Sequence, residues 1–485
     1  MLRFFIMIKN RIENRKFKIT SIGCVTFLLG ANFFLAGCDK ATYPEDKVES
    51  GIKEICKSEY KIDDVEVKFA GSTIGVFLPL KKLFQTDIRQ EILSGQISNL
   101  ESLFEPEPEA MDQLENVLFT ISRVLLSSDR KLDFYILQAA DVESTGLQLV
   151  LMGFMDDVRR VRLWDISRNE YRKRVLHELK FNRSVLWEKP VRALLREVNS
   201  LNYENLVKNY FVERPTPEQA SPLFYDLLAT RENKRALKIE IEEIKSRSYR
   251  DEQALVYAKI KEVYEPKEGV SAHSFAYPSG TVLEYIFIVQ PHDRQYKINQ
   301  IVPLYYLDET KQLRKVPLPP ELDLAQNLET WSERFQVEEI ILGEFLARQL
   351  NRRVQGLLLS DERIHHTIRH AQVNFDYRKD SVASGKPHFA LYFDFLTKAM
   401  KKSAGRTVEQ VIADEDVLYL FNLIILEFAD LVRSYRFNDY EYLELIWEPG
   451  GTASVLQLFP ERLDLFRVKK LSISALLESP SNAIF

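Results

Sequence analysis

Three of the chain's seven histidines lie close together, at His365, His366 and His370. On a helix, Glu362 would share one face with His366 and His370. Two histidines four residues apart can bind zinc. However, Glu362 precedes both histidines, unlike the His-Glu-x-x-His order of zinc proteases. A strand is predicted to begin at Ala371, and no further ligand is visible. We therefore interpret this cluster as the polar, solvated end of a helix and predict neither a bound metal nor a cofactor.

Other catalytic arrangements are not evident in the sequence. Ser72 lies in a predicted hairpin turn, and no histidine pattern suggests a base that would activate it. The 71 acidic residues are too many for spacing alone to identify a catalytic pair. Glycine is scarce, at 17 of 485 residues, and the chain has no Gly-x-Gly-x-x-Gly, Walker A or Gly-x-Ser-x-Gly motif. We therefore predict no catalytic residues.

The chain has three cysteines, whose surroundings differ. Cys56 shares one predicted helix face with Val48 and Ile52, which is typical of a small buried hydrophobic residue rather than a nucleophile. Cys24 lies inside an uncharged apolar run, Ile19–Leu35, and Cys38 follows that run.

The first forty residues have the pattern of a secretory signal. Six basic residues and only one acidic residue, Glu13, precede the apolar run. The run is about 17 residues long, which is short for a membrane-spanning helix of roughly 20 residues. Small residues follow it at Ala36 and Gly37. Together these features predict a signal peptide over residues 1–37, and an uncleaved membrane anchor remains the alternative.

The sequence Leu35-Ala36-Gly37-Cys38 resembles the lipobox of bacterial lipoproteins, a resemblance that covers only the first forty residues. It implies that a diacylglyceryl group is added to the Cys38 thiol and that signal peptidase II cuts between Gly37 and Cys38. Acyl chains such as palmitate would then hold the protein on a membrane of the cell envelope, facing the periplasm or the exterior. Asp39 resembles the inner-membrane retention signal of enterobacteria. Only Cys56 would remain as a free thiol, so no internal disulfide is expected.

Composition narrows the possible partners. The net charge is −5, and removal of the basic first 37 residues would make the chain more acidic, which argues against a nucleic-acid partner. A hydrophobic content of 45% is ample for packed cores. The apolar segment Val417–Val432 contains Glu427 and Asp430, so we interpret it as a buried helix rather than a membrane span.

Two arginine groups could face anionic lipid headgroups, although charged faces are more often solvated surface. One group lies on a predicted long helix and the other on a predicted strand. The first comprises Arg348, Arg352 and Arg353, and the second comprises Arg159, Arg160 and Arg162.

The predicted fold class is α+β, with antiparallel sheets packed by helices. Proline clusters divide the chain after the signal peptide into an N-terminal module (38–212), a central domain (213–316) and a C-terminal module (317–485). The central domain, with a short helix and four predicted strands, loosely resembles cystatin-like and nuclear-transport-factor-2-like domains. Helices are predicted at 47–60, 111–126, within 169–212, at 331–354 and at 417–432, and strands at 65–70, 74–80, 133–139, 147–152, 237–244, 254–264, 282–290, 296–306, 371–377, 388–395, 441–447 and 456–458.

The two outer modules are predicted to be copies of one fold. Residues 110–167 and 411–474 share the order helix, strand, strand, and 47–80 corresponds to 331–395. Each copy contains Leu-Gln-Leu. The pattern Asp-x-x-Arg-Val that begins at Asp157 also recurs at Asp464. Repeated units of this kind usually form binding surfaces. The leading hypothesis is therefore a non-catalytic envelope lipoprotein that binds a protein or lipid partner, and the alternative is an envelope hydrolase with an unrecognised active site.

Overall fold

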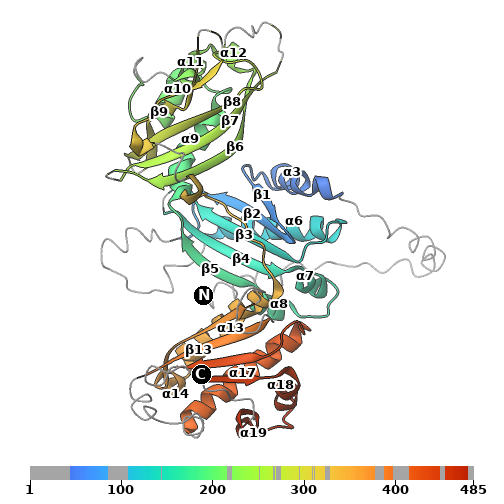
Figure 1. Cartoon of the computed structure of the whole chain (residues 1–485). Coiled ribbons are helices and arrows are strands. Elements are labelled where there is room, and N and C mark those ends of the chain that lie inside the picture. The colour runs from blue at the N-terminus through green and yellow to red at the C-terminus, as the bar shows by residue number, and fades with distance from the viewer. Residues whose placement is uncertain are drawn as a thin grey trace, which may run out of the picture. The chain divides into compact units, whose positions relative to one another are not determined.

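The protein has an α+β fold in which helices pack against mostly antiparallel sheets (Figure 1). The chain divides into two compact units, one comprising Met1–Tyr171 with His177–Glu338 and the other comprising Arg172–Leu176 with Glu339–Phe485. The computed structural model describes residues 44–85, 107–143, 145–215, 221–250, 252–265, 268, 275–293, 295–308, 310, 312–322, 328–376, 387–396, 414–447 and 454–478.

The first unit begins with a five-stranded sheet of order β1-β2-β3-β4-β5. Strands β2 and β3 are parallel, while β1–β2 and β3–β4 are antiparallel. A parallel pair requires a crossover connection, and α6 lies between β2 and β3 in the chain. The elements are α3 (Val48–Tyr60), β1 (Glu66–Ala70), β2 (Thr73–Leu80), α6 (Pro108–Leu126), β3 (Phe134–Asp141), β4 (Leu147–Phe154), α7 (Met155–Arg162), α8 (Arg168–Arg174) and β5 (Leu176–Phe181), preceded by the short helix η1 (Glu45–Lys47).

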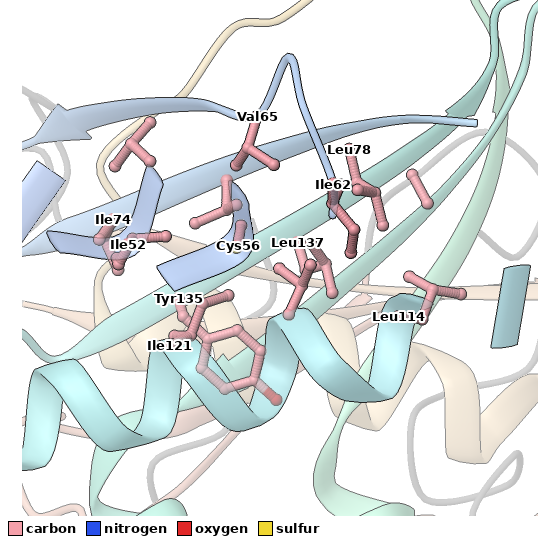
Figure 2. Packing of buried hydrophobic residues seen from close by; sticks show 14 of the residues in the cluster. Ile52, Cys56, Ile62, Val65, Ile74, Leu78, Leu114, Ile121, Tyr135 and Leu137 are labelled. Carbon is pink, nitrogen blue, oxygen red and sulfur yellow. The ribbon is translucent and has the colours of Figure 1, made fainter. Parts of the chain in front are cut away.

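Helices α3 and α6 bury their apolar sides against this sheet (Figure 2). Ile52 and Cys56 lie one helical turn apart on α3, and both are fully buried. Ile121 of α6 and Leu137 of β3 belong to the same core. Burial raises the pKa of the Cys56 thiol to about 11, so the thiol stays protonated at neutral pH. The core position predicted for Cys56 from the sequence is therefore confirmed.

The same unit contains an antiparallel sheet of order β6-β7-β8-β9, built from the four strands predicted for the central domain. Val191 and Leu194 of α9 lie in the core of this sheet, although the sequence had placed this helix in the N-terminal module. The boundaries at 212 and 316 stay a prediction. The elements are α9 (Ser184–Glu197), α10 (Tyr203–Tyr210), α11 (Pro222–Leu228), α12 (Arg231–Lys234), β6 (Leu237–Ser248), β7 (Ala254–Tyr264), β8 (Val282–His292), β9 (Gln295–Pro303), the hairpin β10 (Tyr305–Leu307) and β11 (Leu313–Lys315), and the short helices η4 (Pro320–Leu322) and η5 (Leu328–Thr330).

The second unit has a four-stranded sheet of order β12-β13-β14-β15. Strands β13 and β14 are parallel, and the outer pairs are antiparallel. Phe421 and Phe428 of α17 are buried, and their rings contact Phe393 and Phe389 of β13. The elements are α13 (Leu342–Ser360), α14 (Glu362–His365), β12 (Ile368–Asp376), β13 (His388–Phe395), α17 (Glu415–Ser434), β14 (Leu443–Trp447), β15 (Ser454–Leu458), α18 (Pro460–Arg467) and α19 (Ile473–Leu477).

The segment Val417–Val432 lies within α17, and its apolar residues are largely buried in the second unit. Over the described parts of the chain, no helix combines the length and the apolar character needed to cross a bilayer.

The duplication is confirmed by connectivity. Apart from the short helix α14 after α13, each module runs helix, strand, strand, helix, strand, strand and two short helices, and each sheet has a parallel inner pair. The closing turns also agree. Trp164 and Lys469 both follow the C-cap of the first short helix, with φ angles of 63° and 59°. Next, Ser167 and Ser472 each accept a backbone hydrogen bond from the residue three positions ahead.

The register inferred from the sequence is wrong by two residues at these turns. The sequence alignment matched Asp157 with Asp464, whereas the shared turn pairs Trp164 with Lys469. Asp157 and Asp464 each lie near an arginine three residues later, at 3.6 and 3.5 Å. Such pairs occur anywhere on a helix surface, so they do not mark an equivalent position. The two Leu-Gln-Leu sequences also differ in place, since one begins β4 and the other ends β15.

Three expected elements differ from the sequence prediction. The helix expected from Trp331 begins only at Leu342, because the preceding residues are extended and Ser332 forms a β-bridge with Ser246. Strand β5 interrupts the segment expected to be helical. The three arginines expected on a strand lie on α7, where acidic residues occupy the first turn and arginines the last, as the helix dipole favours. They are Arg159, Arg160 and Arg162.

Candidate functional site

The outer face of the sheet in the second unit is exposed along β12 and at Tyr392 of β13, whereas His388 and Ala390 on the same face are buried. On β12, Ala371 and Val373 are buried, whereas His370, Gln372 and Asn374 are exposed. This alternation follows from the two-residue period of a strand. The strand therefore has one apolar face and one polar face that is accessible to a ligand.

Tyr392 lies near the middle of this face and is 44% exposed. Across the strands it is paired with Gln372 on one side and Ile446 on the other. We call this surface the open sheet face. Its residues are His370, Gln372, Asn374, Tyr392, Asp394, Glu444, Ile446 and Gln457.

The amide groups of the open sheet face bond to neighbours on that face. Gln372 Nε2 donates to Asn374 Oδ1 at 3.2 Å, and Gln457 Nε2 donates to Glu444 Oε1 at 3.2 Å. Partial burial, together with the nearby charge of Glu444, raises the pKa of the Tyr392 phenol. The phenol therefore remains a neutral hydrogen-bond donor. These amides and the phenol are groups that can bind the backbone of another polypeptide.

The matching face of the N-terminal sheet is covered by an extended part of the same chain. We call residues 332–337 the covering segment. Phe335 is 1% exposed, and its ring lies 5.5 Å from that of Phe77 on β2. A Cβ atom at Gly75 would lie 2.2 Å from Val337 Cγ2 and 2.9 Å from Phe335 Cζ. A glycine is therefore required for this close approach.

Side-chain amides of the sheet and its edge hold the backbone of the covering segment. The Arg334 carbonyl accepts from Gln138 Nε2 at 2.9 Å and from Gln148 Nε2 at 3.3 Å. Asn182 Nδ2 donates to the Glu333 carbonyl at 3.2 Å. Since three amides converge on two adjacent peptide groups, the face recognises backbone as well as side chains.

Charged groups complete the attachment. The Arg334 guanidinium is 3% exposed, contacts Glu66 and Asp64, and lies 4.7 Å from the centre of the Phe77 ring. Although burial raises the pKa of Asp64, the charges of Arg334 and Arg196 outweigh it, so the pKa is lowered overall. Arg334 is therefore a buried cation whose charge is balanced by carboxylates from the sheet side of the contact.

Glu188 of α9 also binds the backbone of the covering segment. Its carboxylate is fully buried and accepts from the Arg334 backbone N–H at 3.1 Å and from Arg192 Nε at 2.9 Å. Burial raises the pKa of Glu188 to about 7, against the opposing effect of Arg192. The cluster ties together segments far apart in the chain and has a structural role.

The two outer faces occupy equivalent places in the duplicated fold. Phe77 of β2 and Tyr392 of β13 both lie on the second strand of a sheet. Both point away from the helices that pack on the other face of that sheet. Phe77 is fully buried beneath Phe335, whereas Tyr392 is 44% exposed. One face of a single fold is thus filled by an extended segment in the first copy and is accessible in the second.

The histidine cluster does not form a shared helical face. His365 ends α14, His366 is its C-cap, and His370 lies on β12. His366 Nε2 is 4.0 Å from Glu362 Oε1, and both side chains are largely exposed. A group of three or more side chains arranged to hold a metal ion was not found among the described residues.

The remaining residues selected from the sequence have ordinary surroundings or lie outside the described residues. Gly37 and Cys38, which carry the predicted cleavage and lipid attachment, lie outside them. Ser72 is in the turn between β1 and β2. Arg352 Nη1 donates to the Val175 carbonyl at 2.9 Å.

Sequence reasoning missed a buried pair of carboxyl groups in the first unit. Asp226 of α11 is 1% exposed and Glu262 of β7 is fully buried. Asp226 Oδ1 accepts from the Ala276 backbone N–H at 2.9 Å, and Glu262 Oε2 accepts from the Tyr264 hydroxyl at 2.8 Å. The other oxygen of each carboxyl has no separate donor.

Burial raises the pKa of Asp226, and burial together with the charge of Asp226 raises the pKa of Glu262, so at neutral pH the pair holds at least one proton. A signal for the pair was present on β7, where Glu262 continues the inward-facing series of Ala258 and Ile260. A carboxylate in phase with buried apolar residues requires a partner.

Comparison with known proteins gave no relative: no protein-family model, no curated protein and no solved structure matches this chain.

Proposed function

We propose that this protein is a non-catalytic lipoprotein of the cell envelope that binds an extended segment of a partner protein on its open sheet face. The observation that carries the proposal is the covering segment in the N-terminal copy. There, the same face of the same fold already holds an extended polypeptide, through amides to its backbone and through Phe77 to its Phe335 side chain.

The chemistry of the open sheet face suits a similar ligand. Gln372 and Gln457 can exchange their present bonds for bonds to peptide carbonyls, as Gln138 and Gln148 do in the other copy. Tyr392 offers an aromatic surface and a hydroxyl donor, a combination enriched in binding hot spots. We therefore expect a partner with an extended backbone and an apolar side chain seated on Tyr392.

The proposal is tested by placing a photo-activatable phenylalanine analogue at Tyr392 in the full-length protein in its own cells. Irradiation should yield one discrete protein adduct, because the ring lies at the centre of the contact. A peptide made from the cross-linked partner segment should bind the purified full chain, and Tyr392→Ala should weaken that binding by about tenfold or more, as expected of a central aromatic contact.

The matched control places the same analogue at Leu359 of α13, which is 88% exposed and belongs to a helix rather than to the open sheet face. No adduct, equal adducts at the two positions, or peptide binding that is indifferent to Tyr392→Ala would each contradict the proposal.

Anchoring is proposed to occur through acyl chains on Cys38, with the inner membrane favoured by Asp39. Cys38→Ala should abolish lipid attachment and leave the signal uncut by signal peptidase II. Mass spectrometry of the N-terminal peptide and fractionation of membranes provide the measurement, and Cys56→Ala serves as the matched control that retains the lipid. An unmodified Cys38 thiol in the wild-type protein would remove this part of the proposal.

The second candidate function, an envelope hydrolase, is favoured by one observation. Asp226 and Glu262 have raised pKa values, a property common at active sites. Both side chains are nevertheless buried in a core that includes Tyr277 and Tyr285, so a substrate could reach them only after local opening. We therefore favour the binding protein.

A further inference from the structure

An exposed aromatic residue stands at the corner between α7 and α8. Trp164 is 86% exposed and its neighbour Leu163 is 78% exposed. The other three tryptophans, Trp187, Trp331 and Trp447, are at most 9% exposed. Burial of these two side chains would be favourable in free energy. We therefore expect a ligand to cover this corner.

The backbone gives a second, independent reason. Trp164 has a φ of 63°, in the left-handed region that bulky residues rarely adopt and that glycine normally fills after a helix. The equivalent corner in the second copy carries Lys469, with a φ of 59°. The fold therefore needs the left-handed corner but does not need an indole on it.

Basic and apolar side chains surround the corner. The Arg162 guanidinium lies 5.3 Å from the centre of the Phe119 ring, which is 47% exposed, and donates to Ser122 Oγ at 2.8 Å. The nearby Asp165 is paired with Arg160 at 2.9 Å, so its charge is offset. We call this surface the tryptophan patch. Its residues are Phe119, Arg159, Arg162, Leu163, Trp164 and Arg168, all partly or fully exposed.

We infer that the tryptophan patch contacts an anionic phospholipid surface. Tryptophan favours the interface between headgroups and acyl chains, while arginines bind phosphate groups of anionic lipids. Leu163 and Trp164 would enter the interface, and Arg159 and Arg162 would meet the headgroups. The patch thus joins the two kinds of group that hold peripheral proteins on membranes.

This inference rests on the proposed anchor for the nearness of the membrane. Six peptide units separate Cys38 from Pro44, the first described residue, and such a length spans at most about 20 Å. The first unit, which contains the patch, would therefore be held beside the bilayer.

The test uses the full-length protein in vesicles of phosphatidylglycerol and phosphatidylcholine, with or without brominated acyl chains. Since Trp164 is the one strongly exposed tryptophan, it should dominate any change in emission. We expect brominated lipid to quench an emission component that acrylamide in the water does not reach. That component should be lost in Trp164→Gly, which suits the left-handed corner and should therefore keep the fold.

Two further arms separate this inference from the proposed anchor. Quenching by brominated lipid is measured in both the wild type and Cys38→Ala. The contact of Trp164 with lipid can therefore be judged even if Cys38 proves not to be lipidated. Replacing phosphatidylglycerol by phosphatidylcholine should weaken the contact, as should Arg159→Gln with Arg162→Gln.

Trp164 reached by acrylamide but not by brominated lipid, in protein bound to the vesicles, would overturn the inference. Protection from both quenchers would also overturn it, since that result indicates that protein covers the patch.

Discussion

Replacing Arg334 by alanine is expected to lower the free energy of unfolding of the first unit by about 3–5 kcal/mol, the usual cost of breaking a buried ion pair. The guanidinium is 3% exposed and neutralises Glu66 and Asp64. Its removal would leave Glu66 with Arg192 alone and Asp64 with Arg196 alone, and would open a space beside Phe77. The backbone of the covering segment would keep its bonds to the amides, to Glu188 and to Lys68.

Urea denaturation followed by hydrogen exchange at the β2 amides measures the effect in this unit. The matched control is Arg250→Ala, which breaks a pair with Glu321 whose side chains are more than half exposed. Exposed pairs contribute about 0–1 kcal/mol, so this variant should be nearly neutral. Equal losses of stability in Arg334→Ala and Arg250→Ala would show that the buried cluster does not hold the covering segment.

Local patterns in the sequence were sufficient for much of the fold. The strict alternation around Ala371 and Val373 predicted β12, and the apolar run of Val417–Val432 predicted the buried helix α17. Both patterns arise from one strand or helix packing on one core, so neighbouring residues carry the information. The repeated order of elements was likewise visible, and it predicted the duplicated fold.

Local patterns failed where distant contacts decide the structure. Residues after Trp331 look helical, yet they are extended because Ser332 pairs with Ser246 and Arg334 contacts Glu66, which is 268 residues away in the chain. Tertiary contacts of this kind override the helix propensity of a segment. The register of the repeats failed for a different reason: Asp-x-x-Arg is a general helix pattern and gives no position along the fold.

For the candidate site, too, local patterns predicted one part and distant contacts decided the rest. The polar side of β12 could be inferred from Gln372 and Asn374, but their exposure could not, because it depends on what other segments cover. In the N-terminal copy, Lys68 has the alternation of a solvent-facing residue and nevertheless bonds to Glu333 and Phe335 of the covering segment. Whether a sheet face is free is therefore a property of the whole chain and not of the strand.

The stability of the first unit is expected to fall as the pH rises from about 5 to 8, by on the order of 3 kcal/mol. Burial raises the pKa of Glu262 to about 8 and that of Asp226 to about 6, above the ordinary carboxyl values near 4. Groups with raised pKa values bind protons more tightly when folded. Their contribution is therefore complete below the unfolded pKa and is lost as the pH passes the folded values.

Glu262→Gln should remove a large part of this pH dependence, because an amide stays neutral and can still donate to Asp226, whereas Glu188, whose pKa is also raised by burial, keeps its own contribution. The variant should be more stable than the wild type at pH 8 and no more stable at pH 5, as measured by urea denaturation at both values. The matched control is Glu240→Gln on β6, a carboxylate that is exposed and paired with Lys238, which should keep the wild-type slope. A wild-type slope in Glu262→Gln would show that the carboxyl pair does not share a proton in the folded protein.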